Sequence, residues 1–259
     1  MTDALDRWAI ITGASSGLGI EFAKQLAAMK VNLILVARRR EPMEKLAEDL
    51  AGSGIQVVVE PMDLVVPGAA QELEQRLDAR GIEPEILINN AGFGLFGYLL
   101  DQKPEDVRGM LELDILALTE LSRRFGKRMS DRGRGHILLV ASVAAYQPTP
   151  LYAVYGAAKA YVLSFGVSLN HELGPDVGVT VVSPGLMDTG FNNVSGQPVT
   201  DIMRRNMTSV PEAAKIGLDA MFAKKSNAVV GRLNRVFMFM NRIFSRDFQA
   251  KMIFKMQQA

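Results

Sequence analysis

Cysteine is absent from the 259-residue sequence, which excludes a disulfide framework, a thiol nucleophile and thiolate metal sites. Histidine occurs only as His136 and His171, neither with metal-ligand spacing to other donors, so we expect no metal site. No run reaches 18 consecutive apolar residues, which argues against a membrane-spanning helix. The net charge is only +1, so the chain as a whole lacks the positive field that attracts nucleic acid.

The composition and length indicate one globular domain. Hydrophobic residues make up 48% of the chain and charged residues 22%, a balance that separates it from disordered proteins. A single α/β domain can use all 259 residues. The first six residues carry acids where a signal peptide has basic residues, and we therefore expect a cytoplasmic protein.

Short apolar runs alternate with longer helical patterns along the chain. Strands are predicted over 8–12, 32–37, 56–60, 85–89, 136–141, 177–183 and 228–231, and helices over 17–29, 41–52, 67–80, 104–130, 152–174 and 211–223. Most of the strands are continuous Val/Ile/Leu runs, which is typical of parallel strands covered on both faces. Repeated βα units predict a doubly wound sheet with right-handed crossovers.

A glycine-rich segment, TGASSGLG at 12–19, follows the first strand directly and begins a helix. Glycine lets the backbone approach a pyrophosphate closely, and the N–H groups at the helix start attract the anion. The strand before and the helix after favour a dinucleotide site over an ordinary βα turn.

The end of the second strand bears on which dinucleotide binds. NAD sites usually place an acid there, but this strand continues as Arg38-Arg39-Arg40, with no acid before Glu41. A guanidinium binds a 2′-phosphate through charge-assisted hydrogen bonds, so the sequence predicts NADP(H), with Arg38 as the first candidate. The alternative is a solvated basic helix start, which is our interpretation of Arg40.

Tyr155 and Lys159 are four residues apart in a predicted helix and therefore share one face. A nearby ammonium favours the phenolate and lowers the tyrosine pKa toward the working range of an acid–base catalyst. Ser142, at the end of the fifth strand, is placed to hydrogen-bond a substrate oxygen from the same side. A tyrosine and lysine at this spacing are common on helix faces, so the pair alone does not specify a function.

Several motifs together resemble the short-chain dehydrogenase/reductase family. They are TGASSGLG at 12–19, NNAG at 89–92, Ser142, Tyr155 with Lys159, and Pro184-Gly185 with Thr189. The resemblance runs in order from about residue 8 to residue 190. It implies a single-domain Rossmann fold with a seven-stranded parallel sheet, and hydride transfer between a nicotinamide and a carbonyl or alcohol.

The resemblance also implies roles for individual residues. Tyr155 would be the acid/base, Ser142 would orient the carbonyl, and Lys159 would lower the tyrosine pKa and bind the nicotinamide ribose. The other implied cofactor contacts are Gly13, Ser15, Ser16, Gly17, Leu18 and Gly19 at the pyrophosphate, Asp63 and Leu64 at the adenine, Asn90, Ala91 and Gly92 at its ribose, and Pro184, Gly185 and Thr189 near the nicotinamide. Asp63 has an alternative interpretation as a polar cap after the third strand.

One position departs from the family pattern. Asp114 stands where the family usually has an asparagine whose main chain holds a water of the proton relay. A carboxylate there would stabilise the ammonium of Lys159 and compete with the phenolate for it. We therefore include Asp114 among the catalytic candidates. Whether the proton relay of the family is preserved with aspartate at this position stays open.

The substrate is expected to be apolar. Its candidate walls are segments 93–100, 143–147 and 186–206, at the carboxyl ends of strands. Two other functions remain open: a slow NADP-sensing regulatory protein, which Asp114 suggests, and a sugar epimerase or dehydratase, which normally has a larger C-terminal domain. The long helices over 104–130 and 152–174 are candidates for the interface of a homo-oligomer.

The C-terminal tail, residues 232–259, differs from the Rossmann domain of residues 1–231. From Ser226 to Ala259 there are six cations and one acid, a charge of +5 that leaves −4 for the rest. Helical spacing predicts amphipathic helices in the tail. One interpretation is a helix pair that covers the substrate cleft or a subunit interface, and the other is a helix resting weakly on anionic lipid.

Overall fold

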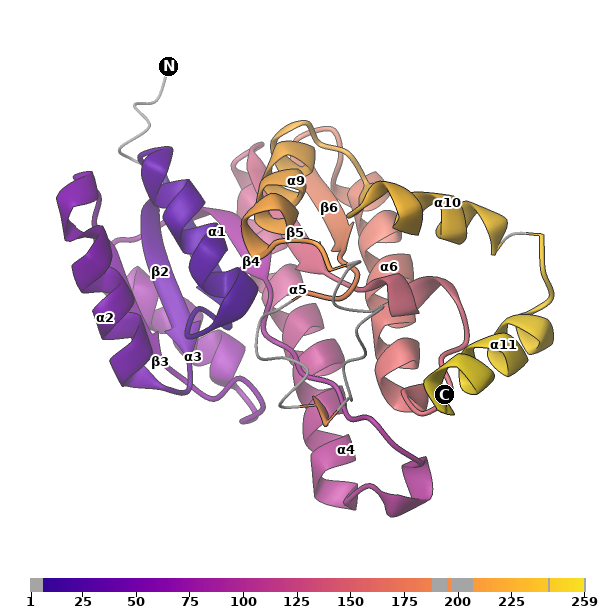
Figure 1. The fold of residues 1–259 in the computed structure, drawn as a ribbon. Helices are drawn as coiled ribbons and strands as arrows, with labels where there is room; N and C mark the ends of the chain where they lie inside the picture. Colours follow the sequence, from indigo (N-terminus) through magenta and orange to yellow (C-terminus); the bar gives the residue numbers. More distant parts are fainter. Residues whose placement is uncertain (1–6, 188–194, 197–206, 242, 259) are drawn as a thin grey trace.

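Seven strands form one parallel sheet in the order β3-β2-β1-β4-β5-β6-β7 (Figure 1). The computed structural model describes residues 7–187, 195–196, 207–241 and 243–258. The strands are β1 (Trp8–Thr12), β2 (Asn32–Ala37), β3 (Val57–Pro61), β4 (Pro84–Asn89), β5 (Gly135–Val140), β6 (Val177–Ser183) and β7 (Asn227–Val229). Each lies within two residues of its predicted bounds, and the predicted doubly wound Rossmann sheet is confirmed.

Helices cover both faces of this sheet. They are α1 (Gly17–Ala28), α2 (Arg40–Leu50), α3 (Ala69–Asp78), α4 (Pro104–Leu111), α5 (Leu118–Asp131), α6 (Ala153–Leu173), α9 (Val210–Phe222), α10 (Arg232–Met240) and α11 (Arg246–Gln258). Short 3-10 turns occur at η2 (Ala51–Ser53), η3 (Leu99–Asp101) and η5 (Val143–Tyr146). No helix in the described ranges is long and apolar enough to cross a bilayer.

Two hydrophobic cores lie on opposite faces of the sheet because successive side chains of a strand point to opposite sides. Ile11 of β1 packs in the core shared with α1, α2 and α9. Its neighbour Ile10 packs in the core shared with α3, α5 and α6. The strands are therefore apolar on both faces, which explains why their sequences are continuous apolar runs rather than alternating ones.

The predicted helix over 104–130 is interrupted. Between α4 and α5 lies a π-helical segment, η4 (Glu112–Ala117), whose wider turn contains the fully buried Asp114. Single π turns inside α-helices frequently occur at functional sites. Helix periodicity predicted the length of this element correctly but not the wider turn.

The chain order brings the expected site residues to one edge of the sheet. From β1 the chain runs outward to β2 and β3 and then returns to β4, which pairs with the other side of β1. At such a switch point the connections leave β1 and β4 in opposite directions and open a crevice at the carboxyl ends of the strands.

Candidate active site

A large cavity of about 1110 Å³ lies at this edge, with walls from the segments that follow β1, β2, β3, β4, β5 and β6. Most of the predicted site residues line it: Gly13, Ser15, Ser16, Gly17, Leu18, Arg38, Asp63, Leu64, Asn90, Ala91, Gly92, Ser142, Tyr155, Lys159, Pro184 and Gly185. Two predicted residues, Gly19 and Asp114, do not line it. Thr189 lies outside the described residues.

The glycine loop is closely packed onto the strand beside it. Gly13 has a φ of +68°, and a Cβ there would lie 2.8 Å from the side-chain nitrogen of Asn90. A Cβ on Gly19 would lie 2.3 Å from the carbonyl oxygen of Gly13. Gly19 therefore permits the helix to approach the loop, whereas Gly13 lines the cavity itself.

Thr12 holds this loop to the end of β4, a role that the sequence analysis missed. Its buried hydroxyl donates to the carbonyl of Ile88 at 3.2 Å and accepts the N–H groups of Asn90 and Ala91 at 2.9 and 3.0 Å. The Asn90 side chain donates back to the carbonyl of Thr12 at 2.9 Å. These bonds fix the loop relative to the neighbouring strand before any ligand arrives.

The start of α1 fits a pyrophosphate. The first amide N–H groups of a helix have no intrahelical acceptor and carry partial positive charge. The N-cap side chain, Ser16, makes no capping hydrogen bond among the described residues, and the first turn of α1 has no acid. Because Gly13, Ser15, Ser16 and Gly17 all face the cavity here, the residues present suit an anionic group.

Two arginines line the next part of the cavity, at the end of β2. Arg38 and Arg39 are both exposed, and the Arg39 guanidinium donates to the carbonyl and hydroxyl oxygens of Ser15 at 3.3 and 3.2 Å. Arg40 lies away from the cavity and pairs with Glu44 at 3.2 Å. The sequence analysis ranked Arg38 first and overlooked Arg39, although both belong to the same basic run.

On the neighbouring strand, Asp63 and Leu64 follow β3 and also line the cavity. One carboxylate oxygen of Asp63 accepts the Val65 N–H at 3.3 Å, which is the local turn expected of a polar cap. Asp63 also lines the cavity. It therefore both caps the turn after β3 and faces the cavity.

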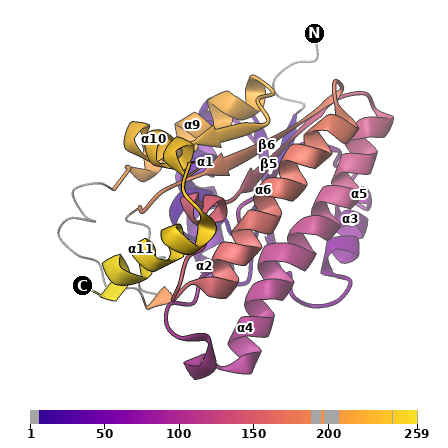
Figure 2. The same ribbon diagram turned by 90° about the vertical axis from the view of Figure 1, so that its right-hand side faces the viewer.

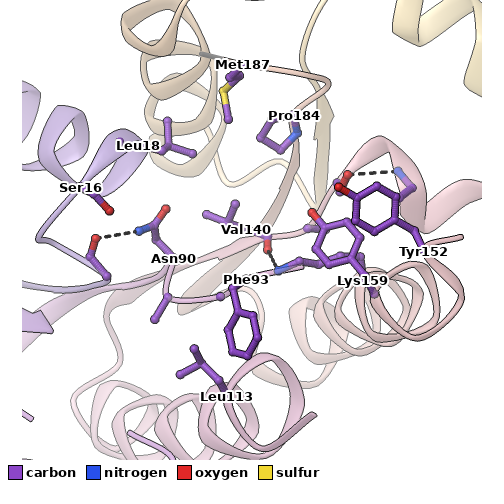
Figure 3. Close-up of a pocket in the computed structure, with 18 of the residues that line it drawn as sticks. Ser16, Leu18, Asn90, Phe93, Leu113, Val140, Tyr152, Lys159, Pro184 and Met187 are labelled. Carbon is purple, nitrogen blue, oxygen red and sulfur yellow. Dashed lines mark hydrogen bonds between the residues drawn. The ribbon is translucent and has the colours of Figure 1, made fainter. Parts of the chain in front are cut away.

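Ser142, Tyr155 and Lys159 all line the cavity, and Figure 3 shows Lys159 on the side of the cavity opposite Ser16 and Leu18. The Ser142 hydroxyl accepts the Ala144 N–H at 3.1 Å and thereby caps η5. Tyr155 and Lys159 lie one turn apart on α6, with the Lys159 nitrogen 5.6 Å from the centre of the Tyr155 ring. Lys159 also donates to the carbonyl of Val140 at 3.2 Å. The three side chains that the sequence selected are thus brought together.

The protonation of Tyr155 follows from its surroundings. Burial raises the pKa of its phenol above the usual value, while the charge of Lys159 and the hydrogen bond with Ser142 act in the opposite direction. The Asp114 carboxylate adds to the upward shift of this pKa. The phenol is therefore protonated at neutral pH and can act as a proton donor.

Asp114 does not line the cavity, but its carboxylate contacts the ammonium of Lys159. One carboxylate oxygen lies 3.0 Å from the Lys159 nitrogen, and the other accepts the Phe93 N–H at 3.2 Å. A Cβ on Gly92 would lie 2.8 Å from that second oxygen, so glycine at 92 leaves room for the ion pair. Burial lowers the pKa of Lys159, but the Asp114 carboxylate and Tyr155 together raise this pKa above its usual value.

Aromatic and apolar side chains form the remaining wall. The Tyr152 ring lies 5.4 Å from that of Tyr155 and 5.3 Å from that of Phe96, and its hydroxyl donates to Ser195 at 2.8 Å. Burial raises the pKa of Tyr152 to about 12. Tyr152 has no lysine four residues later, so the spacing that selects Tyr155 does not select it, although Tyr152 lines the cavity.

The predicted substrate segments contribute in part. Phe93, Val143, Ala144, Gln147, Leu186 and Met187 line the cavity. Residues 188–194 and 197–206 lie outside the described part of the chain. The C-terminal helix α11 adds Ile253, Met256 and Gln257, so the tail forms part of the cavity wall. Among the described residues, no group of three His, Asp or Glu side chains is placed to hold a metal ion.

Comparison with known proteins finds one matching family and several related proteins. The family described as short chain dehydrogenase matches residues 7–200. A very-long-chain 3-oxoacyl-CoA reductase of Podospora anserina is 32% identical over 220 residues, which cover 82% of this chain and 64% of that protein. The human 17-beta-hydroxysteroid dehydrogenase type 3 is 28% identical over 192 residues, which cover 73% of this chain and 61% of that protein.

A solved structure extends the similarity over most of the fold. The short-chain dehydrogenase from Sphingobium yanoikuyae in complex with NADPH superposes with a TM-score of 0.81 at 29% identity, covering 92% of this chain and 93% of that one. The chain spans less than two thirds of the length of the two curated relatives. Since the family match extends over most of the sheet and the whole Ser142–Lys159 region, the chain belongs to the short-chain dehydrogenase family.

Proposed function

We propose that this protein is an NADP(H)-dependent oxidoreductase that interconverts a bulky, apolar ketone or aldehyde and its alcohol. The observation that carries the proposal is the placement of Ser142, Tyr155 and Lys159 at one end of a cavity whose other end is the glycine loop and the Arg38–Arg39 pair. The cavity therefore offers phosphate-binding groups and an acid–base group at two ends of one extended space.

In the proposed reaction, a bound nicotinamide supplies or accepts the hydride at the carbonyl carbon. The Tyr155 phenol gives its proton to the substrate oxygen during reduction and takes it back during oxidation. Ser142 holds the same oxygen through a hydrogen bond. Lys159 holds the nicotinamide ribose and keeps positive charge beside the phenol, which limits the rise in its pKa.

The binding roles follow the order of groups along the cavity. Gly13, Ser15, Ser16, Gly17 and Leu18 surround the pyrophosphate, with Gly19 packing the helix behind them. Arg38 and Arg39 hold the 2′-phosphate of NADP(H), and Asp63, Leu64, Asn90, Ala91 and Gly92 border the adenosine. Pro184 and Gly185 border the nicotinamide. The NADPH complex of the Sphingobium relative supports this choice of cofactor.

The proposed substrate class follows from the apolar part of the cavity lining, to which Phe93, Leu113, Met187, Ile253 and Met256 belong. Relatives named for a hydroxysteroid and a very-long-chain 3-oxoacyl-CoA support a large, mainly apolar carbonyl compound.

The test is NADPH and NADH oxidation across a panel of ketones and aldehydes of increasing size, measured beside the affinity for each cofactor. We expect turnover with NADPH that increases with the apolar bulk of the substrate. Tight NADPH binding with no turnover of any panel member would contradict the proposal and favour a cofactor-sensing protein on the same fold.

A further inference from the structure

Helix α10 has an asparagine on the face that contacts the protein and most of its large apolar side chains on the face toward solvent. Asn234, Met238 and Asn241 form its partly buried face: Asn234 donates to the Val230 carbonyl at 2.8 Å, and Asn241 donates to the side chain of Gln147. No residue of α10 is fully buried, and Phe237 and Phe239 are 60% and 63% exposed. This is the reverse of the amphipathic pattern that packs a surface helix onto a core.

Residues 243–245, which precede α11, and α11 itself also expose large apolar side chains while a polar side chain is buried. Gln249 is buried and donates to the carbonyls of Asn241 and Phe244 at 2.7 and 2.8 Å, so a glutamine anchors this helix. Large apolar side chains again face solvent. We call the whole set the C-terminal apolar surface: Leu233, Val236, Phe237, Phe239, Met240, Ile243, Phe244, Phe248, Met252 and Met256.

The same two helices carry positive charge. Arg232, Arg235, Arg246, Lys251 and Lys255 are all exposed. The acid between them, Asp247, is already paired with Lys251 at 2.8 Å. An exposed apolar face bordered by a net positive charge is complementary to a surface that has an anionic outer layer and an apolar interior.

We propose that α10, the turn after it and α11 bind the anionic headgroup surface of a lipid bilayer, with the C-terminal apolar surface entering the headgroup–acyl boundary. At about 100° per residue, the apolar side chains of α10 extend over about 160° of the helix circumference. Such a wide arc suits a fluid interface, which accepts side chains in many directions, better than one groove of a folded partner.

Charge separates this partner from a second copy of the chain. Two copies joined through the C-terminal apolar surface would bring five exposed cations of one copy near five of the other, with one acid on each side. Like charges placed opposite each other disfavour association. An anionic lipid surface instead gains from every one of these cations.

The surface also borders the cavity. Figure 1 shows α10 and α11 at the edge of the molecule away from α2 and β3, and Figure 2 views the molecule from that edge. Met256 lines the cavity and is 68% exposed, so the cavity reaches the outside beside this surface. The rings of Phe254 and Tyr98 also pack edge to face, with their centroids 6.3 Å apart, next to the exposed Leu99 and Leu100 of η3.

This placement has a consequence for catalysis, which rests on the proposed function. An apolar ketone dissolved in the bilayer would reach the cavity at Met256 without crossing water. The lipid contact itself does not depend on the reaction, and it can therefore be tested without cofactor or substrate.

The test is co-sedimentation of the full chain with phosphatidylcholine vesicles and with vesicles that also contain phosphatidylglycerol, at low and high salt. We expect binding to the anionic vesicles only, and weaker binding at high salt because ions screen the attraction. Arg235→Gln with Lys255→Gln should weaken the partition coefficient about 30-fold, at about 1 kcal/mol for each cation. Phe237→Ser with Phe239→Ser should weaken it at least about tenfold.

Matched controls are the exposed residues at the far side of the fold. Lys24→Gln with Lys45→Gln on α1 and α2 removes the same charge, and Met29→Ser removes an exposed apolar side chain. These variants should bind vesicles as the parent does, and circular dichroism checks that all variants are folded.

Three results would overturn the proposal: no binding to anionic vesicles, equal binding to neutral ones, or equal losses in the control and C-terminal variants. A dimer in sedimentation velocity that Phe237→Ser with Phe239→Ser dissociates, without vesicle binding, would assign the surface to a second copy. Turnover of soluble ketones is measured separately, so failure of the lipid contact is distinguishable from failure of the proposed reaction.

Discussion

The segments around β1 and β4 and the C-terminal helix α11 line the same cavity, but the C-terminal helices α10 and α11 are built differently from those segments. Around β1 and β4, the buried Thr12 hydroxyl joins three main-chain groups, and Gly13 and Gly19 allow contacts that no larger residue permits. Helix α10 has no fully buried residue and is held by asparagines. One wall is thus rigid before ligand arrives, while the other presents its apolar side chains outward.

This difference corresponds to two tasks. A cofactor has a constant shape, so its wall benefits from preorganised hydrogen-bond donors. A family of apolar substrates, or a lipid surface, requires apolar area more than fixed polar contacts. We therefore expect chemistry and stability to depend on the segments around β1 and β4, and the C-terminal helices to contribute little to either.

The largest effect is expected at the catalytic tyrosine. Tyr155→Phe keeps the buried ring but removes the proton that the substrate oxygen receives, so kcat should fall about 10²- to 10⁴-fold. NADPH affinity should change little. Tyr161→Phe is the matched control on the same helix, because Tyr161 lies outside the cavity lining. Steady-state kinetics check both variants, and a tyrosine variant with more than about a tenth of the parent kcat would exclude Tyr155 as the acid–base group.

The next effect concerns the 2′-phosphate. NADPH should bind more tightly than NADH, and Arg38→Ala should weaken NADPH binding about 10- to 150-fold through the loss of charge-assisted bonds worth about 1.5–3 kcal/mol. Arg39→Ala should act in the same direction, while NADH affinity stays unchanged in both.

Arg40→Ala is the control for these two variants, since Arg40 belongs to the same basic run but pairs with Glu44 away from the cavity. Fluorescence titration with both cofactors measures the affinities. Equal affinity of the parent for NADPH and NADH would contradict the assignment of the arginines.

Substitutions in the glycine loop and in helix α10 should have different effects on the free energy of unfolding. Thr12→Val removes the buried acceptor of the Asn90 and Ala91 N–H groups, and leaving a buried group unsatisfied costs about 1–3 kcal/mol. Phe237→Ser alters an exposed side chain and should change the free energy of unfolding by no more than about 0.5 kcal/mol. Urea unfolding of both variants measures this, and similar losses would mean that α10 supports the fold as much as the loop does.

The regions also differ in how far sequence predicted them. The glycine loop, Ser142, Tyr155 and Lys159 were identified because their roles depend on local spacing and on the ends of strands. Thr12 and Tyr152 were missed, since their roles arise from contacts with residues 76 and 43 positions away. Helical periodicity found the amphipathic tail, but it cannot tell which face turns inward.

The smallest effect is expected at Asp114, and it is a shift of pH dependence. Because the Asp114 carboxylate raises the pKa of Tyr155, Asp114→Asn should lower that pKa. Alcohol oxidation needs the phenolate, so its rate rises with pH through this pKa, and the rise should move to lower pH. Carbonyl reduction needs the phenol, so its fall at high pH should move in the same direction.

Glu112→Gln provides the control for Asp114→Asn, because it makes the same carboxylate-to-amide change in η4 at a residue that pairs with Arg108 instead of Lys159. Its pH profile should match the parent's. Profiles of kcat/KM in both directions check the shift, and an unchanged Asp114→Asn profile would mean that only the main chain matters at this position. A shift to higher pH would instead mean that Lys159 loses its charge once its buried partner is gone, since burial alone lowers the pKa of Lys159. The sign of the shift therefore tells whether the carboxylate acts on Tyr155 directly or through the charge of Lys159.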